Sequence, residues 1–171
     1  QVYGFDSFEG FPPVYNEKDE LSQFDQLFKE KKISEEHHAD IQKNKELRSL
    51  VVNKKLSVSN ISSSENFVCA SLEGLKRKIE CLGLNNIHLI KGPFNETMTS
   101  SQPYPTKIMA GIFDCDLHQS YQTALPFIWP RLTKGGYIFL DEYYSLKFPG
   151  ARIATNEFFA SKLDKPQQHK Y

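Results

Sequence analysis

The sequence predicts a single α/β domain built around a parallel β-sheet. Short apolar runs that are typical of strands alternate with longer segments that have helical patterns. The runs at 108–113 and 137–140 are apolar throughout, as expected for strands covered by helices on both faces. The 171 residues suffice for one domain with its own core, and no internal repeat is present.

The first strand-like run ends at Asp6, and the Pro-Pro pair at 12–13 stops any regular element there. Residues 14–66 then differ in composition, because Lys, Glu, Asn and Ser dominate and apolar residues are scattered. We expect one or two amphipathic surface helices followed by a loop at 57–66, together forming a polar helical insertion or lid.

Two adjacent histidines, His37 and His38, lie within this polar segment. Consecutive residues point to different faces of a helix, so the pair is poorly arranged to bind one metal ion. We expect solvated histidines rather than ligands.

Regular alternation returns after residue 70. Leu72, Leu75, Ile79 and Leu82 recur at three- and four-residue steps, which predicts a helix with one buried face. Ser71 can cap its start and Gly83 can end it. Strands are predicted within 86–92, 107–116 and 137–142, a helix at 117–132, and a last helix from Pro149 to about 163, since proline favours the first turn of a helix.

Composition excludes several classes of protein. Lys plus Arg equals Asp plus Glu, 21 of each, so no basic surface for nucleic acid is indicated. No run has the length of a membrane span and no signal peptide is recognisable, so we expect a cytoplasmic protein that does not bind membranes. Cys69, Cys81 and Cys115 match no zinc pattern and are expected to be reduced core thiols.

Acidic residues follow three of the predicted strands. They are Asp6, the pair Asp114 and Asp116, and the pair Asp141 and Glu142. The carboxyl ends of strands in an open α/β sheet are where ligands bind, so this common position points to a functional site. The alternative for each acid is a structural role, such as Asp116 capping the following helix.

Converging carboxylates repel one another unless a cation binds between them. Mg²⁺ prefers such oxygen ligands, and Asp114, Asp141 and Glu142 could supply them. Asp116, just past the strand end, could face the substrate and act as general base. Cys115, between two acids, is a poor candidate for a nucleophile because neighbouring negative charge disfavours the thiolate.

Five segments together resemble the macrocin O-methyltransferase (TylF/MycF-type) family of S-adenosylmethionine-dependent sugar O-methyltransferases. The segments read "YGFDSFEGFP", "HLIKGPFNET", "FDCDLHQSYQTAL", "GGYIFLDEYYS" and "PGARIATNEFF". They cover most of residues 2–11 and 67–160. The resemblance implies a Rossmann-like class I methyltransferase sheet with flanking helices, and an S-adenosylmethionine- and Mg²⁺-dependent O-methyltransferase.

Specific roles follow from the resemblance. Asp114, Asp141 and Glu142 would hold Mg²⁺, and Asp116 would take the proton from a sugar or similar hydroxyl. Asp6 would bind the ribose of the cofactor, with Ser7 beside it. Glu142 stands where the family usually has Asp, which keeps the negative charge and makes the side chain longer. The partner would be a hydroxylated small molecule, and a homo-oligomer is compatible with the sequence.

The resemblance also shows two absences within residues 1–171. We find no first strand with a Gly-rich loop and no C-terminal β-hairpin, so residues 1–171 are expected to form a single, incomplete methyltransferase domain. The missing strand would lie between the strands ending at Asp6 and Asp114. We therefore expect this stretch alone to bind S-adenosylmethionine weakly or not at all.

Two other functions use the same residues. An acid-x-acid pair such as Asp114 and Asp116 also holds the metal in many nucleotide-sugar glycosyltransferases. A non-catalytic interaction protein would instead use the polar segment 14–66 as its partner surface.

Overall fold

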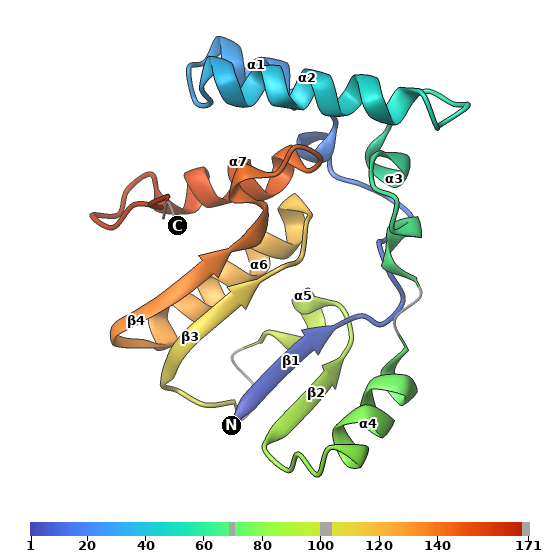
Figure 1. Ribbon diagram of the computed structural model, residues 1–171. Helices are drawn as coiled ribbons and strands as arrows, with labels where there is room; N and C mark the ends of the chain where they lie inside the picture. Colours follow the sequence, from blue (N-terminus) through green and yellow to red (C-terminus); the bar gives the residue numbers. More distant parts are fainter. Residues whose placement is uncertain (69–70, 100–103, 169–171) are drawn as a thin grey trace.

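The computed structural model describes residues 1–68, 71–99 and 104–168 as an α/β arrangement of parallel strands and flanking helices (Figure 1). Its strands are β1 (Val2–Asp6), β2 (Ile87–Lys91), β3 (Ile108–Phe113) and β4 (Leu132–Leu140). Its α-helices are α1 (Gln23–Lys29), α2 (Glu35–Ser49), α3 (Val58–Ile61), α4 (Leu72–Cys81), α5 (Phe94–Thr97), α6 (His118–Ile128) and α7 (Pro149–Phe159). Short 3-10 helices are η1 (Glu17–Asp19), η2 (Glu65–Phe67), η3 (Trp129–Arg131) and η4 (Asp141–Tyr144). Within the described ranges, no helix is long and apolar enough to cross a membrane.

The strands form two parallel pairs instead of one continuous sheet. β1 pairs with β2 from Val2↔Ile87 to Asp6↔Lys91, and β3 pairs with β4 up to Phe113↔Leu140. All four strands run in the same direction, and β1 and β3 are neighbours across the gap between the pairs (Figure 1). The parallel arrangement confirms the prediction from sequence, whereas the division into two sheets leaves one edge each of β1 and β3 without a strand among the described residues.

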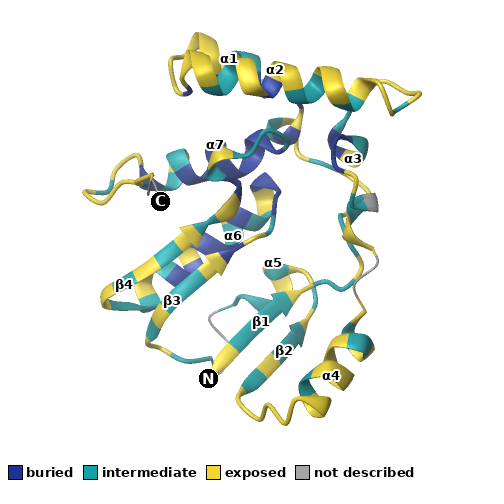
Figure 2. Cartoon of the chain, viewed as in Figure 1, coloured by how far each residue is buried: buried dark blue, intermediate teal, exposed yellow. Residues whose placement is uncertain are grey.

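The main core lies on one side of the β3–β4 pair. Helix α6 supplies Tyr121, Ala124, Leu125 and Phe127, and α7 supplies Ala151, Ala154 and Phe159. The alternation of these apolar residues with polar ones on each helix explains why one face of each helix is buried (Figure 2). Aromatic contacts link this core to the other pair, since the rings of Phe5 and Phe127 lie 6.0 Å apart.

The opposite face of the β3–β4 pair is open. Ile112 pairs with Phe139 across the strands, and their side chains are 77% and 46% exposed. The prediction that helices cover both faces is therefore wrong for the described residues. In these residues, α6 packs on the face that carries Gly111 and Ile138 and no element covers the other.

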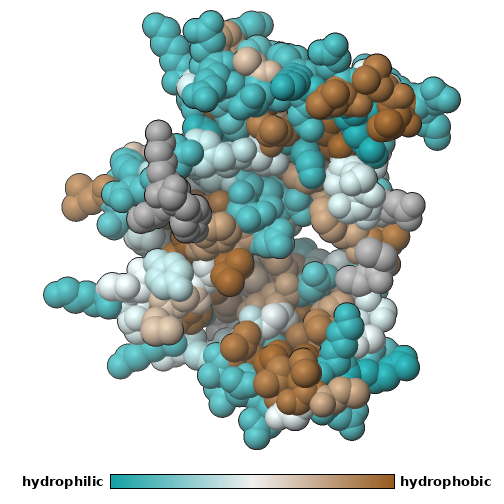
Figure 3. All heavy atoms as spheres, in the orientation of Figure 1, coloured by the Kyte–Doolittle hydropathy of each residue, from teal (hydrophilic) through white to brown (hydrophobic). Residues whose placement is uncertain are grey.

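Helix α4 forms where the spacing predicts it, but without the buried face. Ser71 caps its start by accepting a hydrogen bond from the Gly74 amide at 3.1 Å, and Gly83 follows its end with a φ of 65°. Leu75 and Leu82, by contrast, are 38% and 71% exposed, and no residue of α4 is buried. The reason is the small size of the β1–β2 pair, which offers α4 little surface; apolar side chains gather over this part of the molecule (Figure 3).

The polar segment 14–66 forms helices, as predicted, and these lie beyond α7 at the carboxyl ends of the strands (Figure 1). Phe24, Leu27, Ile33 and Ile41 form a small core of their own against Leu146 and Ile153. The stretch 57–66 is not a simple loop, because it contains α3, whose Val58 and Ile61 are buried with Leu117 and Phe148. Val58 and Ile61 are the two apolar residues of this serine-rich stretch, and two positions are too few to show a helical period in the sequence.

The two histidines of this segment are half-buried, so the expectation of solvated side chains is wrong. His38 Nε2 lies 2.9 Å from Asp25 Oδ1, and its ring stacks on Phe28 with centroids 4.2 Å apart. His37 packs edge-on against Tyr144. Helices α1 and α2 are antiparallel neighbours, so His38, which the sequence places on a surface helix, lies in the contact between the two helices.

Asp19 connects the polar segment to the two core helices. It is almost fully buried, and its Oδ1 accepts a hydrogen bond from the His118 amide at 2.7 Å, which caps the start of α6. The Leu117 side chain at the N-cap position cannot do this. The carboxylate also lies directly against Gly150 in the first turn of α7, where a Cβ atom would overlap Asp19 Oδ1.

We predict that Gly150→Ala lowers the free energy of unfolding by about 1–3 kcal/mol, because the added methyl group displaces this carboxylate. Urea unfolding of the variant measures the change. In an Asp19→Ala background the same substitution should cost less, since the main overlap is gone. An equal cost in both backgrounds would show that the overlap is not the cause.

Candidate active site

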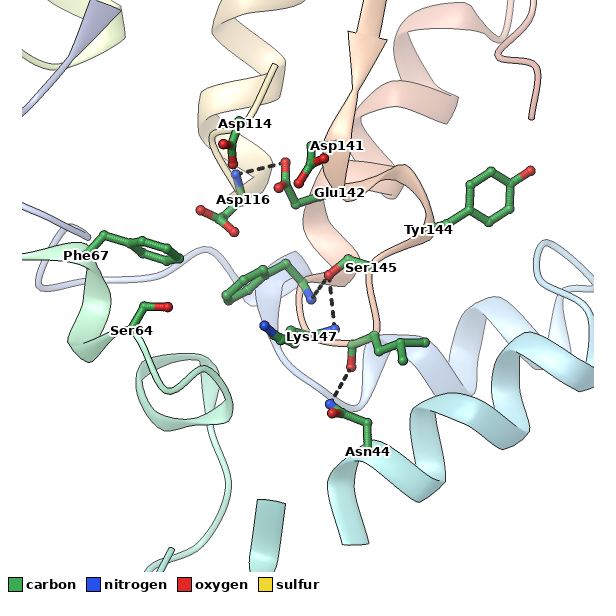
Figure 4. Close-up of a pocket in the computed structure, with 12 residues that line it drawn as sticks. Asn44, Ser64, Phe67, Asp114, Asp116, Asp141, Glu142, Tyr144, Ser145 and Lys147 are labelled. Carbon is green, nitrogen blue, oxygen red and sulfur yellow. Dashed lines mark hydrogen bonds between the residues drawn. The ribbon is translucent and has the colours of Figure 1, made fainter. Parts of the chain in front are cut away.

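The acids that follow β3 and β4 meet in one pocket of about 420 Å³ (Figure 4). Asp114, Asp116, Asp141 and Glu142 line it from the strand ends. The polar segment contributes Asn44, Ser64 and Phe67 to the same pocket, and the turn after β4 contributes Ser145 and Lys147. The sequence therefore predicted correctly that these two acid pairs lie together.

Glu142 is the most firmly held of the four acids. It is only 5% exposed, and its Oε2 lies 2.8 Å from the Tyr121 hydroxyl and 3.3 Å from the Asp116 amide nitrogen. The Tyr121 hydroxyl also lies 3.0 Å from the Phe113 carbonyl, so its single proton is shared between two acceptors. These bonds join the end of β4 to the end of β3 and to α6.

The backbone at Asp116 brings its carboxylate into the pocket. Asp116 has a φ of 55°, in the left-handed region that aspartate tolerates better than most residues. The chain turns there between β3 and α6, and the Asp116 side chain is 8% exposed. Asp116 does not cap α6, because Asp19 accepts the hydrogen bond from the His118 amide.

Burial and mutual repulsion disfavour the charged forms of these acids. Burial first, and then the charge of Asp114, raise the pKa of Asp116 to about 7, while Lys147 opposes the shift. Burial also raises the pKa of Glu142 to about 8, with Asp116, Asp141 and Asp114 adding to the effect and the Tyr121 hydroxyl opposing it. A nearby cation would relieve both costs.

Three of the acids are arranged closely enough to bind one metal ion. Carboxylate oxygens of Asp114, Asp116 and Glu142 all lie within 4.8 Å of one another. Asp141, which the sequence assigned to the metal, is exposed and lies in the same pocket but not in this group of three. Asp116, which the sequence assigned to proton transfer, belongs to the group.

The two residues predicted to bind cofactor lie apart from this pocket. Asp6 is exposed at the end of β1, and its Oδ1 accepts a hydrogen bond from the Phe8 amide at 2.5 Å. Ser7 Oγ donates to the Gly10 carbonyl at 3.2 Å. Neither lines the acidic pocket.

The structure describes two of the cysteines, Cys81 and Cys115. Burial and the surrounding carboxylates of Glu142, Asp116 and Asp114 raise the pKa of the Cys115 thiol, in agreement with the prediction that it is a poor nucleophile. Cys81 is exposed, against the expectation of a core thiol, and Cys69 lies outside the described residues.

Sequence reasoning missed Tyr121 and Lys147. Tyr121 is fully buried, four residues after Leu117 and four before Leu125, so helical spacing alone could have shown that its hydroxyl needs a buried partner. Lys147 carried no such signal, because it reaches the acids only through the turn that follows η4.

The Macrocin-O-methyltransferase (TylF) family model matches residues 37–169, which is more than half of the chain. This protein belongs to that family. No curated protein matches the chain.

A solved structure of the O-methyltransferase NovP is similar to this TylF-family chain in fold. It superposes with a TM-score of 0.57 at 20% sequence identity, covering 93% of this chain and 51% of that one. The chain thus spans about half the length of that structure. At this identity the match supports the fold only, while the family model supports the kind of enzyme.

We predict that this TylF-family chain, without added metal, loses stability as the pH rises. Asp116 and Glu142 have raised pKa values in the folded state. Their protonated forms therefore stabilise the fold fully at a pH below the pKa values of these groups in the unfolded chain, and this contribution is lost as the pH rises through about 7–8. The loss between about pH 6 and pH 8 should be roughly 1–3 kcal/mol, measured by urea unfolding at each pH.

Glu142→Gln should flatten this dependence, and the exposed-site control Glu80→Gln should not. Mg²⁺ should raise the melting temperature of the wild type more at about pH 8 than at pH 6. At the higher pH the carboxyl groups are already largely deprotonated, so Mg²⁺ has fewer protons to displace from them. A pH dependence that is identical in wild type and Glu142→Gln would contradict the prediction.

Proposed function

We propose that this protein is an S-adenosylmethionine- and Mg²⁺-dependent O-methyltransferase that acts on a sugar or a similar hydroxylated small molecule. The observation that carries the proposal is the meeting of four acids, Asp114, Asp116, Asp141 and Glu142, in one pocket at the strand ends, in a chain of the TylF family. The pocket has room for a hydroxylated ligand beside the acids.

The acids fit a hard divalent cation. They offer oxygen atoms at close spacing, and the raised pKa values of Asp116 and Glu142 mark charge that a cation would stabilise. Asp114 and Glu142 would hold Mg²⁺ together with Asp141, as the sequence suggests. When bound there, Mg²⁺ would lower the pKa of an acceptor hydroxyl.

Asp116 is our candidate for the general base. Its buried carboxylate lies in the pocket beside Asp114 and Glu142, within reach of a hydroxyl that a metal ion there would hold. It would take the proton of the acceptor hydroxyl as the oxygen forms its bond to the methyl carbon. Glu142, fixed by Tyr121, and Asp114 would keep the acceptor oxygen in place.

The methyl donor would be bound at the end of β1. S-adenosylmethionine would supply the methyl group and leave as S-adenosylhomocysteine, which keeps the electron pair on sulfur. The exposed carboxylate of Asp6 fits the hydroxyls of a ribose, which donate hydrogen bonds, and Ser7 lies beside it.

Methyl transfer from labelled S-adenosylmethionine to a hydroxylated sugar tests the proposed roles, at a donor concentration high enough for the weak binding expected of residues 1–171. EDTA should abolish transfer, and Asp116→Asn should lower it by about 10²–10⁴-fold. Mg²⁺ titration by calorimetry gives a second readout. If Asp116 is the base, Asp116→Asn keeps Mg²⁺ affinity within about threefold while Asp141→Asn weakens it about tenfold or more.

The control Asp164→Asn, an exposed acid outside the pocket, should change neither quantity. Loss of Mg²⁺ affinity in Asp116→Asn but not in Asp141→Asn would exchange the two roles. Transfer that is insensitive to both EDTA and Asp116→Asn would overturn both assignments.

Membership of the TylF family favours this function over the glycosyltransferase alternative. At about 1 mM ligand, S-adenosylhomocysteine should raise the melting temperature more than a UDP-sugar with Mn²⁺ does. The opposite order would support a glycosyltransferase. A chain that responds to neither ligand and does not bind Mg²⁺ would support the non-catalytic alternative.

A further inference from the structure

A second hollow, of about 390 Å³, lies where the connection between α1 and α2 meets η4 and α7. Its lining includes Lys31, Lys32, His37 and Arg152, together with Ser34 and Tyr144, and it contains no carboxylate among the described residues. It is therefore opposite in charge to the acidic pocket. The fold places a concentration of positive charge where none of the proposed catalytic residues lies.

Arg152 is a buried charged residue in the lining of this hollow. It is only 8% exposed, and it donates to the carbonyls of Lys32 at 2.8 Å and Tyr143 at 3.1 Å. Its guanidinium also lies over the ring of Tyr143, 4.6 Å from the centroid. Within the described ranges, no carboxylate forms an ion pair with it, and its Nε atom has no hydrogen-bond partner.

A buried arginine without a counter-ion is costly. Charged side chains that lie inside proteins are normally paired or bind an ion. Carbonyl oxygens and aromatic rings stabilise the guanidinium in part, but they carry no net negative charge. Burial accordingly lowers the pKa of Arg152, and burial and the charge of Arg152 lower that of His37.

The amino end of α2 opens into the same hollow. Ser34 caps this 15-residue helix by accepting a hydrogen bond from the His37 amide at 3.1 Å. The first two amides, of Glu35 and Glu36, have no partner within the helix, as at the start of every α-helix, and the helix dipole adds positive potential there. The His37 ring belongs to the same lining, and its Nε2 atom is buried.

We propose that this hollow binds a small oxyanion, a phosphate or carboxylate group, between Arg152 and the amino end of α2. Arg152 would supply the buried charge, Lys31 and Lys32 the charge at the rim, and the helix start its free amides. Lys31 is exposed and forms no ion pair within the described ranges, while Lys32 is paired with the exposed Glu30 at 2.6 Å.

The hollow and the acidic pocket share Tyr144 in their linings. In the close-up view the ring of Tyr144 points away from the acids (Figure 4). An anionic group in the hollow therefore lies on the far side of Tyr144 from the acidic pocket, and it is not repelled by direct contact with the acids. The site is independent of the proposed methyl transfer.

The test is an NMR titration of the chain with sodium phosphate, and separately with sodium acetate, at constant ionic strength with EDTA present. We expect a saturable shift of the His37 ring signals and of the Ser34–Glu36 amides, with a Kd of about 1 mM or tighter for the preferred anion. The ring of His88, exposed on β2, is the internal control and should not move. The absence of a saturable shift with both anions would overturn the proposal.

Variants show which residues bind the anion. Arg152→Gln should weaken binding of the preferred anion at least about tenfold. Arg152 also donates hydrogen bonds to two backbone carbonyls, so its replacement can disturb the fold and a second variant is needed. Lys31→Asn removes a rim charge and suits the left-handed backbone there, where φ is 57°. It should weaken binding about threefold or more, compared with Lys43→Gln, which makes the same change of charge on the exposed side of α2. Equal weakening by Lys31→Asn and Lys43→Gln would show an effect of net charge only and would contradict the proposed site.

Discussion

The buried carboxylate of Glu142 determines how the end of the β3–β4 pair is organised. It accepts hydrogen bonds from the Tyr121 hydroxyl and the Asp116 amide, so it fixes α6, the left-handed turn after β3 and the start of η4 at once. Burying a carboxylate costs free energy unless its oxygens accept hydrogen bonds. Because a Glu142 carboxylate oxygen also lies within 4.8 Å of oxygens of Asp114 and Asp116, the side chain that orders the turn also brings three acids together. The order of the turn and the proposed binding of a cation thus depend on the same buried side chain.

Local patterns predicted much of the fold. The four strands, the cap at Ser71, the stop at Gly83 and the start of α7 at Pro149 depend on residues near in sequence, and all of them form. The bounds of β4 differ from the prediction, because it begins at Leu132, where a helix end was expected, and gives way to η4 at Asp141. Burial was predicted less well, because it depends on distant partners. Leu82 and Ile112 have the residue type and spacing of core positions, yet they are exposed because no described element packs on them. Val58 and Ile61 show the reverse, since Leu117 and Phe148 bury a stretch that composition marks as a loop.

The acids of the site could be found from their positions at strand ends, since parallel strands place those ends together. Their individual geometry could not. Only the turn at Asp116 decides that its carboxylate, and not that of Asp141, lies within 4.8 Å of Asp114 and Glu142. Arg152 shows the same limit, because a single arginine in a helix pattern says nothing of the carbonyls of Lys32 and Tyr143 that surround it.

The division of the strands into two pairs makes the stability of the molecule uneven. The larger buried clusters belong to α6, α7 and the polar segment, whereas β1, β2 and α4 contribute no buried residue. Side-chain contacts such as Phe5 with Phe127 join the pairs, and among the residues that the structure describes no strand ladder crosses between them. The β1–β2 half is therefore the part that opens first in local unfolding and exchanges its amide protons fastest. Since Asp6 lies on that half and the acids of the pocket on the other, a molecule that contacts both would tie the halves together and make their unfolding more cooperative.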